Sequence, residues 1–261
     1  MNILFIGDVF GKPGRKAVGR LYPSLVDRYQ IDYTIANIEN TADGRGTTPR
    51  IVEDFLELGV QCLTSGNHIW DQREILEYIG DQPRLLRPAN YPPEAPGTGV
   101  HIGETSAGIR VGVMNLQGRV FMNTFSCPFR AAEQILETRT PPPAVWIVDM
   151  HAEATSEKIA MGWHLAGRVA AVVGTHTHVQ TADERILPGG TAYLTDLGMT
   201  GPHDSVIGVE KAAALKRFLT YMPSRFTTAK RDVHLSGAVI TVDEDSGKAT
   251  GIQRIFVEDP A

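Results

Sequence analysis

Short apolar runs alternate with amphipathic stretches through the first half of the chain. Such runs, bounded by polar or glycine-containing turns, predict buried β-strands, and the stretches that follow them predict helices. The expected strands are residues 2–7, 33–38 and 62–64, and the expected helices are residues 13–29, 48–59 and a short segment that stops at Gly80. This strand-then-helix order predicts a parallel sheet joined by right-handed crossovers.

Helix-start signals support these boundaries. Pro13 suits the first helical position of the first helix, since its missing N–H needs no partner there. Thr47 or Thr48 is suited to cap the second helix. Asp71 and Glu74 fit a variant of the capping box and predict the start of the short third helix.

The pattern changes in the middle of the chain. Residues 99–104 and 109–115 flank a small turn and predict a β-hairpin that begins a second sheet. Strand and helix patterns then alternate again before β pattern returns. The further expected strands are residues 145–150, 169–173, 185–187, 191–195, 235–242 and 252–257, and the further helices are residues 129–139, 156–167 and about 208–221. Two sheets packed face to face, with helices outside both, account for this order, and no repeat or linker divides residues 1–261 into more than one domain.

Composition narrows the class of protein. A chain of 261 residues with 42% hydrophobic and 21% charged residues is typical of a soluble globular protein. Its net charge of -5 and pI near 5.9 argue against a partner as highly charged as long nucleic acid, but a small anionic substrate held by metal is compatible. Cys62 and Cys127 are too few for a disulfide framework. No basic leader and no apolar run of about 18 residues is found, so a cytoplasmic protein without a membrane segment is expected.

Potential metal ligands follow five of the predicted strands. In a mostly parallel sheet, residues just beyond the carboxyl ends of the strands gather along one edge. The most conspicuous pair is in the sequence Gly-Thr-His-Thr-His after the strand at 169–173. The residues that five strand ends bring to one cleft are Asp8, Glu39, Asn40, Asn67, His68, His151, His176 and His178.

This set exceeds the four ligands of one tetrahedral zinc site, and therefore predicts two metal ions a few ångströms apart. Glu39 is expected to bridge them. Asp8, Asn40 and His178 would complete one metal's shell, and Asn67, His151 and His176 the other's. His68, adjacent to a ligating Asn67, is predicted to point across the cleft and to act as the general acid that protonates the leaving oxygen.

Each residue also has a simpler interpretation. Asp8 could cap the following helix, Glu39 and Asn40 could be loop polarity, and Asn67 could satisfy turn backbone through an Asx-turn. His151 alone could be a polar residue at a strand end. His68 could be a further ligand or an orienter of phosphate. All of these alternatives would have to coincide at several strand ends, which favours the metal interpretation.

With these residues assembled, the chain resembles the calcineurin-like metallophosphoesterases, whose motifs include Gly-Asn-His and Gly-His-x-His. More closely, it resembles the YmdB branch of bacterial phosphodiesterases. The stretches that carry this resemblance are residues 6–14, 37–40, 66–68, 149–153, 174–178 and 195–199. The resemblance implies a four-layer α/β/β/α sandwich of two mixed sheets, two transition-metal ions such as iron or manganese, and hydrolysis of cyclic nucleotides, including 2′,3′-cyclic ones.

Two departures from the broader superfamily pattern concern the metals. Phe10 stands where the first motif has a second histidine, and residues 37–40 replace Gly-Asp-x-x-Asp. One metal therefore loses an imidazole, with Asn40 as the substitute. Harder oxygen ligation favours manganese or iron over zinc.

The sequence therefore predicts a dinuclear metal-dependent phosphodiesterase for small cyclic nucleotides, 2′,3′-cyclic ones first and 3′,5′-cyclic ones as a further possibility. In this prediction a hydroxide between the metals attacks phosphorus, and His68 protonates the leaving ribose oxygen. The alternatives are a phosphomonoesterase, a nuclease, or a metal-bound nucleotide-sensing regulator with little turnover. A homo-oligomer is compatible with the sequence, which selects no residue for contact with the base.

Overall fold

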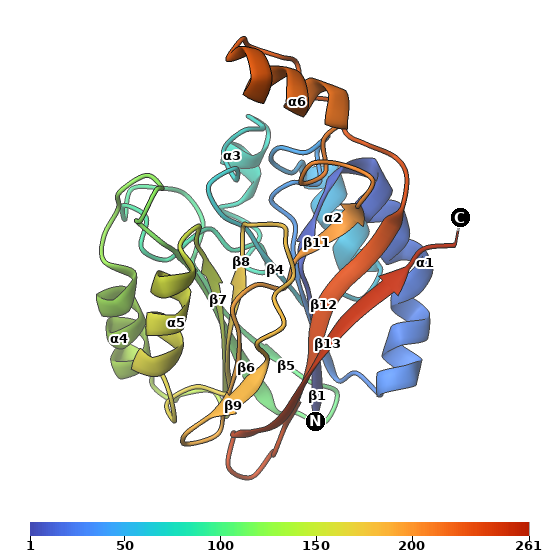
Figure 1. The fold of residues 1–261 in the computed structure, drawn as a ribbon. Helices are drawn as coiled ribbons and strands as arrows, with labels where there is room; N and C mark the ends of the chain where they lie inside the picture. Colours follow the sequence, from blue (N-terminus) through green and yellow to red (C-terminus); the bar gives the residue numbers. More distant parts are fainter. Residues whose placement is uncertain (261) are drawn as a thin grey trace.

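Two β-sheets lie face to face in the computed structural model, which describes residues 1–260 (Figure 1). The first sheet has the order β2-β11-β12-β1-β3-β4, with β13 also paired to β12. β1 runs parallel to β3 and antiparallel to β12, so the sheet is mixed. Its strands are β1 (Asn2–Ile6), β2 (Asp8–Val9), β3 (Tyr33–Asn37), β4 (Cys62–Thr64), β11 (Met199–Pro202), β12 (Val233–Val242) and β13 (Ala249–Glu258).

The second sheet has the order β5-β6-β7-β8-β10-β9 and is also mixed. β5 and β6 form the predicted antiparallel hairpin, while β6, β7, β8 and β10 run parallel. Its strands are β5 (Val100–Glu104), β6 (Arg110–Gln117), β7 (Val145–His151), β8 (Ala171–Thr175), β9 (Arg185–Leu187) and β10 (Thr191–Leu194).

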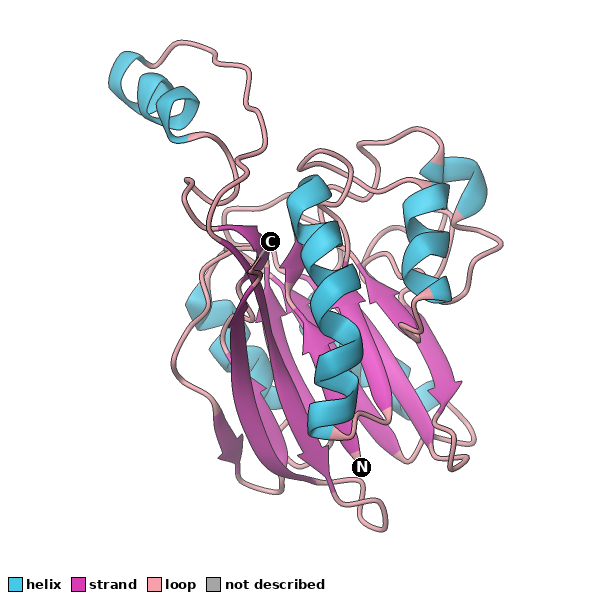
Figure 2. Cartoon of the chain, turned by 90° about the vertical axis from the view of Figure 1, so that its right-hand side faces the viewer, coloured by secondary structure: helices cyan, strands magenta, loops and turns pink. Residues whose placement is uncertain are grey.

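The alternation of side chains along β1 shows how the layers are built. Ile3 and Phe5 pack into the apolar layer between the two sheets, whereas Leu4 and Ile6 pack on the other face, against helices. Helices α1 (Gly11–Tyr29), α2 (Pro49–Glu57) and α3 (Ile75–Tyr78) cover the first sheet, and α4 (Pro128–Thr138) and α5 (Thr155–His164) cover the second (Figure 2). The predicted four-layer α/β/β/α sandwich is thus confirmed.

One helix departs from this layered body. α6 (Lys211–Thr220) projects as an arm beyond the end of the sandwich at which α3 lies (Figures 1 and 2). Phe218, Leu219 and Tyr221 of this arm are exposed. Among the described residues, no helix combines the length and apolar character that crossing a bilayer requires.

Candidate metal centre

Strand ends of both sheets carry the predicted ligands. Asp8 begins β2, and Glu39 and Asn40 follow β3, while Asn67 and His68 follow β4; all belong to the first sheet. His151 ends β7, and His176 and His178 follow β8, in the second sheet. The two groups face each other at the carboxyl ends of the parallel strands, the edge at which α/β folds place their sites.

Three potential ligand groups converge on the Nε2 atom of His151. The nearest ligand atoms of Glu39, His151 and His176 all lie within 4.8 Å of one another. The His151 Nε2 is 2.9 Å from the Asn67 Oδ1, 3.1 Å from the His176 Nδ1 and 3.2 Å from the Glu39 Oε1. One imidazole nitrogen carries at most one proton, so it cannot serve three acceptors well. A metal cation satisfies all of them, and the donor set therefore fits a metal ion.

A polar group on the far side of each ring turns the other nitrogen toward the centre. The His178 Nδ1 lies 2.9 Å from the Ile207 carbonyl, which can only accept, and the His176 Nε2 lies 3.1 Å from a Glu153 carboxylate oxygen. The His151 Nδ1 lies 2.9 Å from the Thr175 hydroxyl, which itself donates to Asp149. Each remote nitrogen thus carries the proton, leaving a lone pair on the facing nitrogen in the neutral ring.

A second group of ligands surrounds Asp8 and His178. The Asp8 Oδ2 accepts the backbone N–H of His176 at 3.1 Å, but its Oδ1 is buried without a hydrogen-bond partner within residues 1–260. This oxygen is 4.0 Å from the His178 Nε2. A buried carboxylate oxygen left unpaired is costly unless a cation lies against it. The second ligand group therefore also fits a metal ion.

Asn40 occupies the space between the two groups. Its Nδ2 donates to the Glu39 Oε1 at 3.2 Å and lies 3.2 Å from the His178 Nε2. The predicted ligation through the amide oxygen requires this amide to turn over, a rotation that does not move the backbone. Metal ligation by Asn40 stays a prediction.

Burial and mutual charge shape the protonation of the cluster. Burial raises the pKa of Asp8. Burial also acts to raise the pKa of Glu39, but the charge and hydrogen bond of His151 outweigh it and lower this pKa to about 2. Burial acts to lower the pKa of His151, but the charge of Glu39 raises it to about 9. Burial and the neighbouring His151 lower the pKa of His176 to about 3. In the absence of metal, a proton on His151 thus balances the charge of Glu39.

His68 lies outside the ligand cluster but is tied to it. Its backbone N–H donates to the Glu39 Oε2 at 3.0 Å, and its Nδ1 lies 2.9 Å from the Asp71 Oδ2. The predicted capping box is wrong, because α3 begins at Ile75 and its N-cap, Glu74, makes no side-chain hydrogen bond. Asp71 orients the His68 ring instead, and its spacing of three residues after His68 is the sequence signal that could have identified this pair.

The turn that carries His176 and His178 has an unusual backbone. Both residues have positive φ angles, 101° and 66°, which are uncommon for residues other than glycine. Thr177 between them donates its hydroxyl to Asp196 at 2.8 Å, and Asp196 also pairs at 2.6 Å with the fully buried Lys158. Sequence reasoning missed Lys158, since nothing in the pattern of α5 distinguishes it from a surface lysine.

Nearly the whole chain is similar to known proteins. A family model described as YmdB-like protein matches residues 4–255. A Bacillus subtilis (strain 168) protein named 2′,3′-cyclic-nucleotide 2′-phosphodiesterase is 48% identical over 99% of this chain and 98% of its own length. A crystal structure of a hypothetical protein from Thermus thermophilus matches with a TM-score of 0.93 and 41% identity, over the full length of both chains. A crystal structure of a Mycoplasma pneumoniae phosphatase matches with a TM-score of 0.93 and 34% identity, covering 99% of this chain and 94% of that one.

Proposed function

The chain belongs to the YmdB-like family, and on this premise we propose that it is a metal-dependent phosphodiesterase that hydrolyses cyclic nucleotides. The 2′,3′-cyclic nucleotides are the preferred class, because the Bacillus subtilis relative is named for them and shares 48% of its residues with this chain. The 3′,5′-cyclic nucleotides are a second class to be tested. We infer that residues 1–261 form one domain, since the ligand set draws on both sheets.

The observation that carries this proposal is the convergence of the histidine lone pairs. His151 and His178 each direct the remote ring nitrogen to a hydrogen-bond acceptor, and the remote nitrogen of His176 lies 3.1 Å from Glu153, so the other nitrogen of each ring faces the ligand groups. Glu39 contacts both ligand groups, through His151 and through Asn40. We propose that Glu39 bridges two metal ions, with Asp8, Asn40 and His178 completing one site and Asn67, His151 and His176 the other.

Oxygen atoms provide much of the ligand set, which favours manganese or iron over zinc. Such ions, when bound, supply a nucleophile from water near neutral pH and positive charge for the phosphoryl oxygens. The buried side chains of Glu39 and His151 exclude bulk water from the floor of the site. Electrostatic interactions with a bound phosphodiester are stronger in such a dry site than at an exposed surface.

His68 is proposed to donate a proton to the leaving ribose oxygen. Its Nδ1 is engaged by Asp71, so the Nε2 of the same ring is free to carry the transferred proton. The backbone hydrogen bond from His68 to Glu39 keeps the acid beside the proposed bridging carboxylate. The His68 side chain retains 26% exposure, so the ring can reach a substrate that enters from solvent.

The experiment is a comparison of substrates with protein loaded with Mn²⁺ or Fe²⁺. We expect hydrolysis of 2′,3′-cAMP to exceed that of p-nitrophenyl phosphate, and His68→Ala to lower turnover by about 10²- to 10⁴-fold without loss of bound metal. His164→Ala is the matched control, because this histidine lies on α5 and pairs with Glu133.

Other outcomes point to other functions. Faster hydrolysis of p-nitrophenyl phosphate would indicate a phosphomonoesterase, which the name of the Mycoplasma pneumoniae structure also suggests for that protein. Binding of 2′,3′-cAMP to metal-loaded protein without turnover would indicate a nucleotide-sensing regulator.

A further inference from the structure

A basic cavity lies against the amino-terminal half of α1. It has a volume of about 520 Å³ and is bounded by this helix, the loop after β3 and the chain segment that leads from the α6 arm into β12. The lining residues are Lys12, Pro13, Lys16, Arg20, Asp43, Thr228, Lys230 and Val233. Four cations against one carboxylate is a strong local excess in a chain with a net charge of -5.

Most of this positive charge is not neutralised by the protein. Lys12 and Lys16 are exposed and lie one turn apart on the same face of α1, and Lys230 is exposed on the opposite wall. Within residues 1–260, none of these three lysines forms an ion pair, whereas Arg20 pairs with Asp259. The cavity therefore presents three unpaired ammonium groups, and a ligand that binds there is expected to be an anion.

The cavity adjoins the metal centre through two shared chain segments. The backbone N–H of Gly11, the residue before Lys12, donates to the Asn40 carbonyl at 2.8 Å. The Phe10 ring packs edge-on against His178, with 5.5 Å between ring centroids. Lys12 is only four residues from Asp8, so their Cα atoms are at most about 14 Å apart. The backbone separation of the two sites is therefore short enough for a substrate longer than a mononucleotide to span.

We propose that this cavity binds the phosphodiester chain of a short RNA whose 2′,3′-cyclic terminal phosphate lies at the metal centre. The inference rests on the proposed function and extends it from mononucleotides to oligonucleotide ends. Lys12, Lys16 and Lys230 contact the phosphates that precede the terminal nucleotide. Pro13, Val233 and the methylene stems of the lysines supply an apolar surface against which a base packs. Long duplexes are not implied, because the surplus of positive charge is local.

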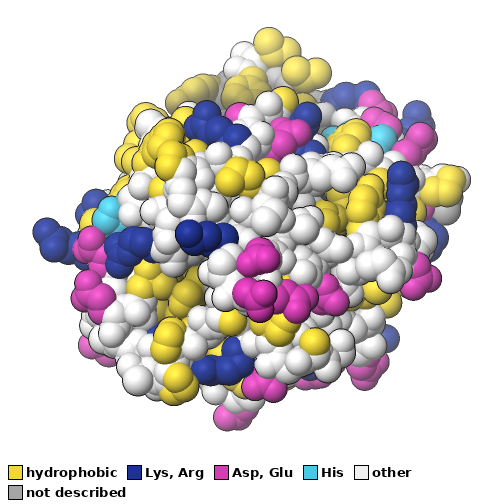
Figure 3. Space-filling model, turned by 90° about the horizontal axis from the view of Figure 1, so that it is seen from below, with side chains coloured by type: hydrophobic (Ala, Val, Ile, Leu, Met, Phe, Trp, Pro, Cys, Tyr) yellow, Lys and Arg dark blue, Asp and Glu magenta, His cyan; other side chains and the backbone are white. Residues whose placement is uncertain are grey.

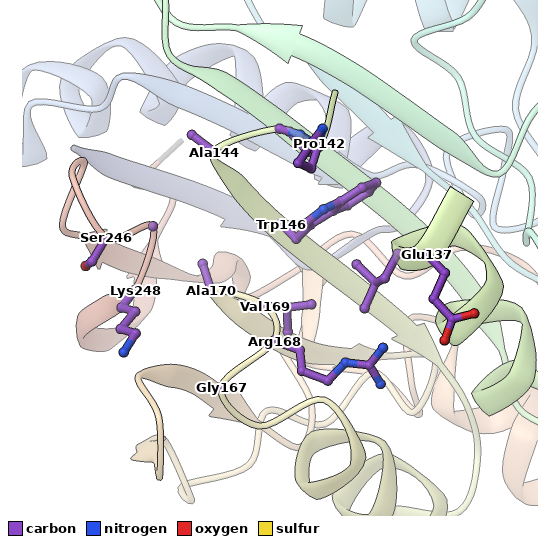
Figure 4. Close-up of a pocket in the computed structure, with 13 residues that line it drawn as sticks. Glu137, Pro142, Ala144, Trp146, Gly167, Arg168, Val169, Ala170, Ser246 and Lys248 are labelled. Carbon is purple, nitrogen blue, oxygen red and sulfur yellow. The ribbon is translucent and has the colours of Figure 1, made fainter. Parts of the chain in front are cut away.

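A second cavity provides the matched control. It lies at the opposite end of the sandwich, where β7 and β8 begin, and Trp146, Arg168 and Lys248 are among its lining residues (Figure 4). Basic and acidic side chains are interspersed over that end of the molecule (Figure 3). Lys248→Gln removes a cavity lysine there without altering the charge near the metal centre.

The test compares three substrates with the same terminal base: 2′,3′-cAMP, its 5′-phosphorylated form and an RNA trinucleotide that ends in the 2′,3′-cyclic phosphate. At about 50 mM salt we expect kcat/KM to be at least tenfold higher for the trinucleotide than for 2′,3′-cAMP. Lys12→Gln/Lys16→Gln should abolish this advantage and leave kcat/KM for 2′,3′-cAMP within twofold of wild type, while Lys248→Gln should change neither. The slope of log kcat/KM for the trinucleotide against log salt concentration should become shallower by about 1.4 in the double variant, since two phosphate contacts are lost.

The proposal is overturned if wild type shows no advantage for the trinucleotide, or if the double variant lowers kcat/KM for both substrates equally. It is also overturned if the 5′-phosphorylated mononucleotide already gives the full advantage, because a single phosphate then suffices. Fluorescence anisotropy of a labelled trinucleotide that ends in a 3′-phosphate measures binding without turnover. Should no substrate be hydrolysed, binding that is weakened at least tenfold by Lys12→Gln/Lys16→Gln supports the cavity assignment by itself, and binding that is unchanged refutes it.

Discussion

Substitution of Gly66 by alanine should disable the metal centre while leaving the fold in place. A Cβ atom added to Gly66 would lie 2.1 Å from the His151 Nε2, 2.2 Å from its Cδ2 and 2.5 Å from its Cε1. Ordinary contacts begin near 3.4 Å, so the imidazole has to retreat by more than about 1 Å. The ring is fully buried and its Nδ1 is held by Thr175, so the retreat also breaks the hydrogen bond that orients it.

The size of the effect differs between stability and metal binding, because the folded structure tolerates an added methyl group better than a metal site tolerates a displaced ligand. Inserting a methyl group into a well-packed interior costs about 1–3 kcal/mol, which a domain of this size survives. Metal–ligand distances, by contrast, tolerate shifts of only about 0.2 Å, and a misplacement of about 1 Å in a catalytic group costs about 10²-fold in rate. We therefore expect Gly66→Ala to lower metal occupancy below half and turnover of 2′,3′-cAMP by at least 10²-fold, with a folded protein by circular dichroism.

Metal analysis after reconstitution, turnover and thermal melting together check this expectation. Gly19→Ala is the matched control, because nothing lies within 4 Å of a Cβ added at Gly19 in α1. Alanine there should stabilise the helix by about 0.5–1 kcal/mol and leave metal content unchanged. Full metal occupancy together with turnover within twofold of wild type in Gly66→Ala would refute the reasoning.

Three further predictions concern buried groups of the ligand cluster and of the residues that support it. Lys158→Met leaves Asp196 buried without its cation and should lower the free energy of unfolding by about 3–5 kcal/mol, as measured by urea denaturation of protein from which metal has been removed by a chelator. A decrease below about 1 kcal/mol would contradict this prediction. Asp149→Asn frees the Thr175 hydroxyl to turn toward His151 and should therefore weaken metal affinity about 10- to 100-fold, as measured by competition with a chelator. An unchanged affinity would contradict this prediction. Because the pKa of His151 is raised from 6.5 to about 9 in the folded protein, its stabilising contribution is fully present below about pH 6.5 and is lost as pH rises through 9. The melting temperature of chelated protein should thus fall between pH 7 and 10, and His151→Gln should remove that fall.

Much of the fold could be predicted because each strand is short, apolar and bounded by turn residues. The strand expected at 62–64 is β4, and the hairpin expected around residues 106–108 is formed by β5 and β6. β11 (Met199–Pro202) was missed, since Gly201 and Pro202 carry no strand signal. This strand pairs in parallel with β2, so the local environment of Asp8 depends on a contact between segments almost 200 residues apart.

The part of the candidate site that could be predicted is the set of residues that follow parallel strands, because the ends of such strands converge at one edge of the sheet. That rule brought Glu39, His151 and His176 together, and their ligand atoms lie within 4.8 Å of one another. The positive φ angles of the histidine turn could not be predicted, because few residues other than glycine adopt them and no local pattern in residues 174–178 marks them. The contacts that hold this turn come from distant parts of the chain, since Thr177 donates to Asp196 and Asp196 pairs with Lys158. The orientation of each imidazole was equally hidden, since it depends on acceptors such as the Ile207 carbonyl in the segment before α6.

Asp149 explains how ligands from two separate sheets can keep one geometry. It belongs to β7 of the second sheet, but it accepts hydrogen bonds from Asn37 and Thr64 at the ends of β3 and β4 in the first. It also accepts from Thr175, which holds the His151 ring. A sliding of one sheet over the other would therefore break both of the buried hydrogen bonds from Asn37 and Thr64, each costing about 1–3 kcal/mol when a polar group is left unpaired. Because metal–ligand distances tolerate only about 0.2 Å, we expect this buried cross-link to be what allows ligands from both sheets to serve the proposed dinuclear site.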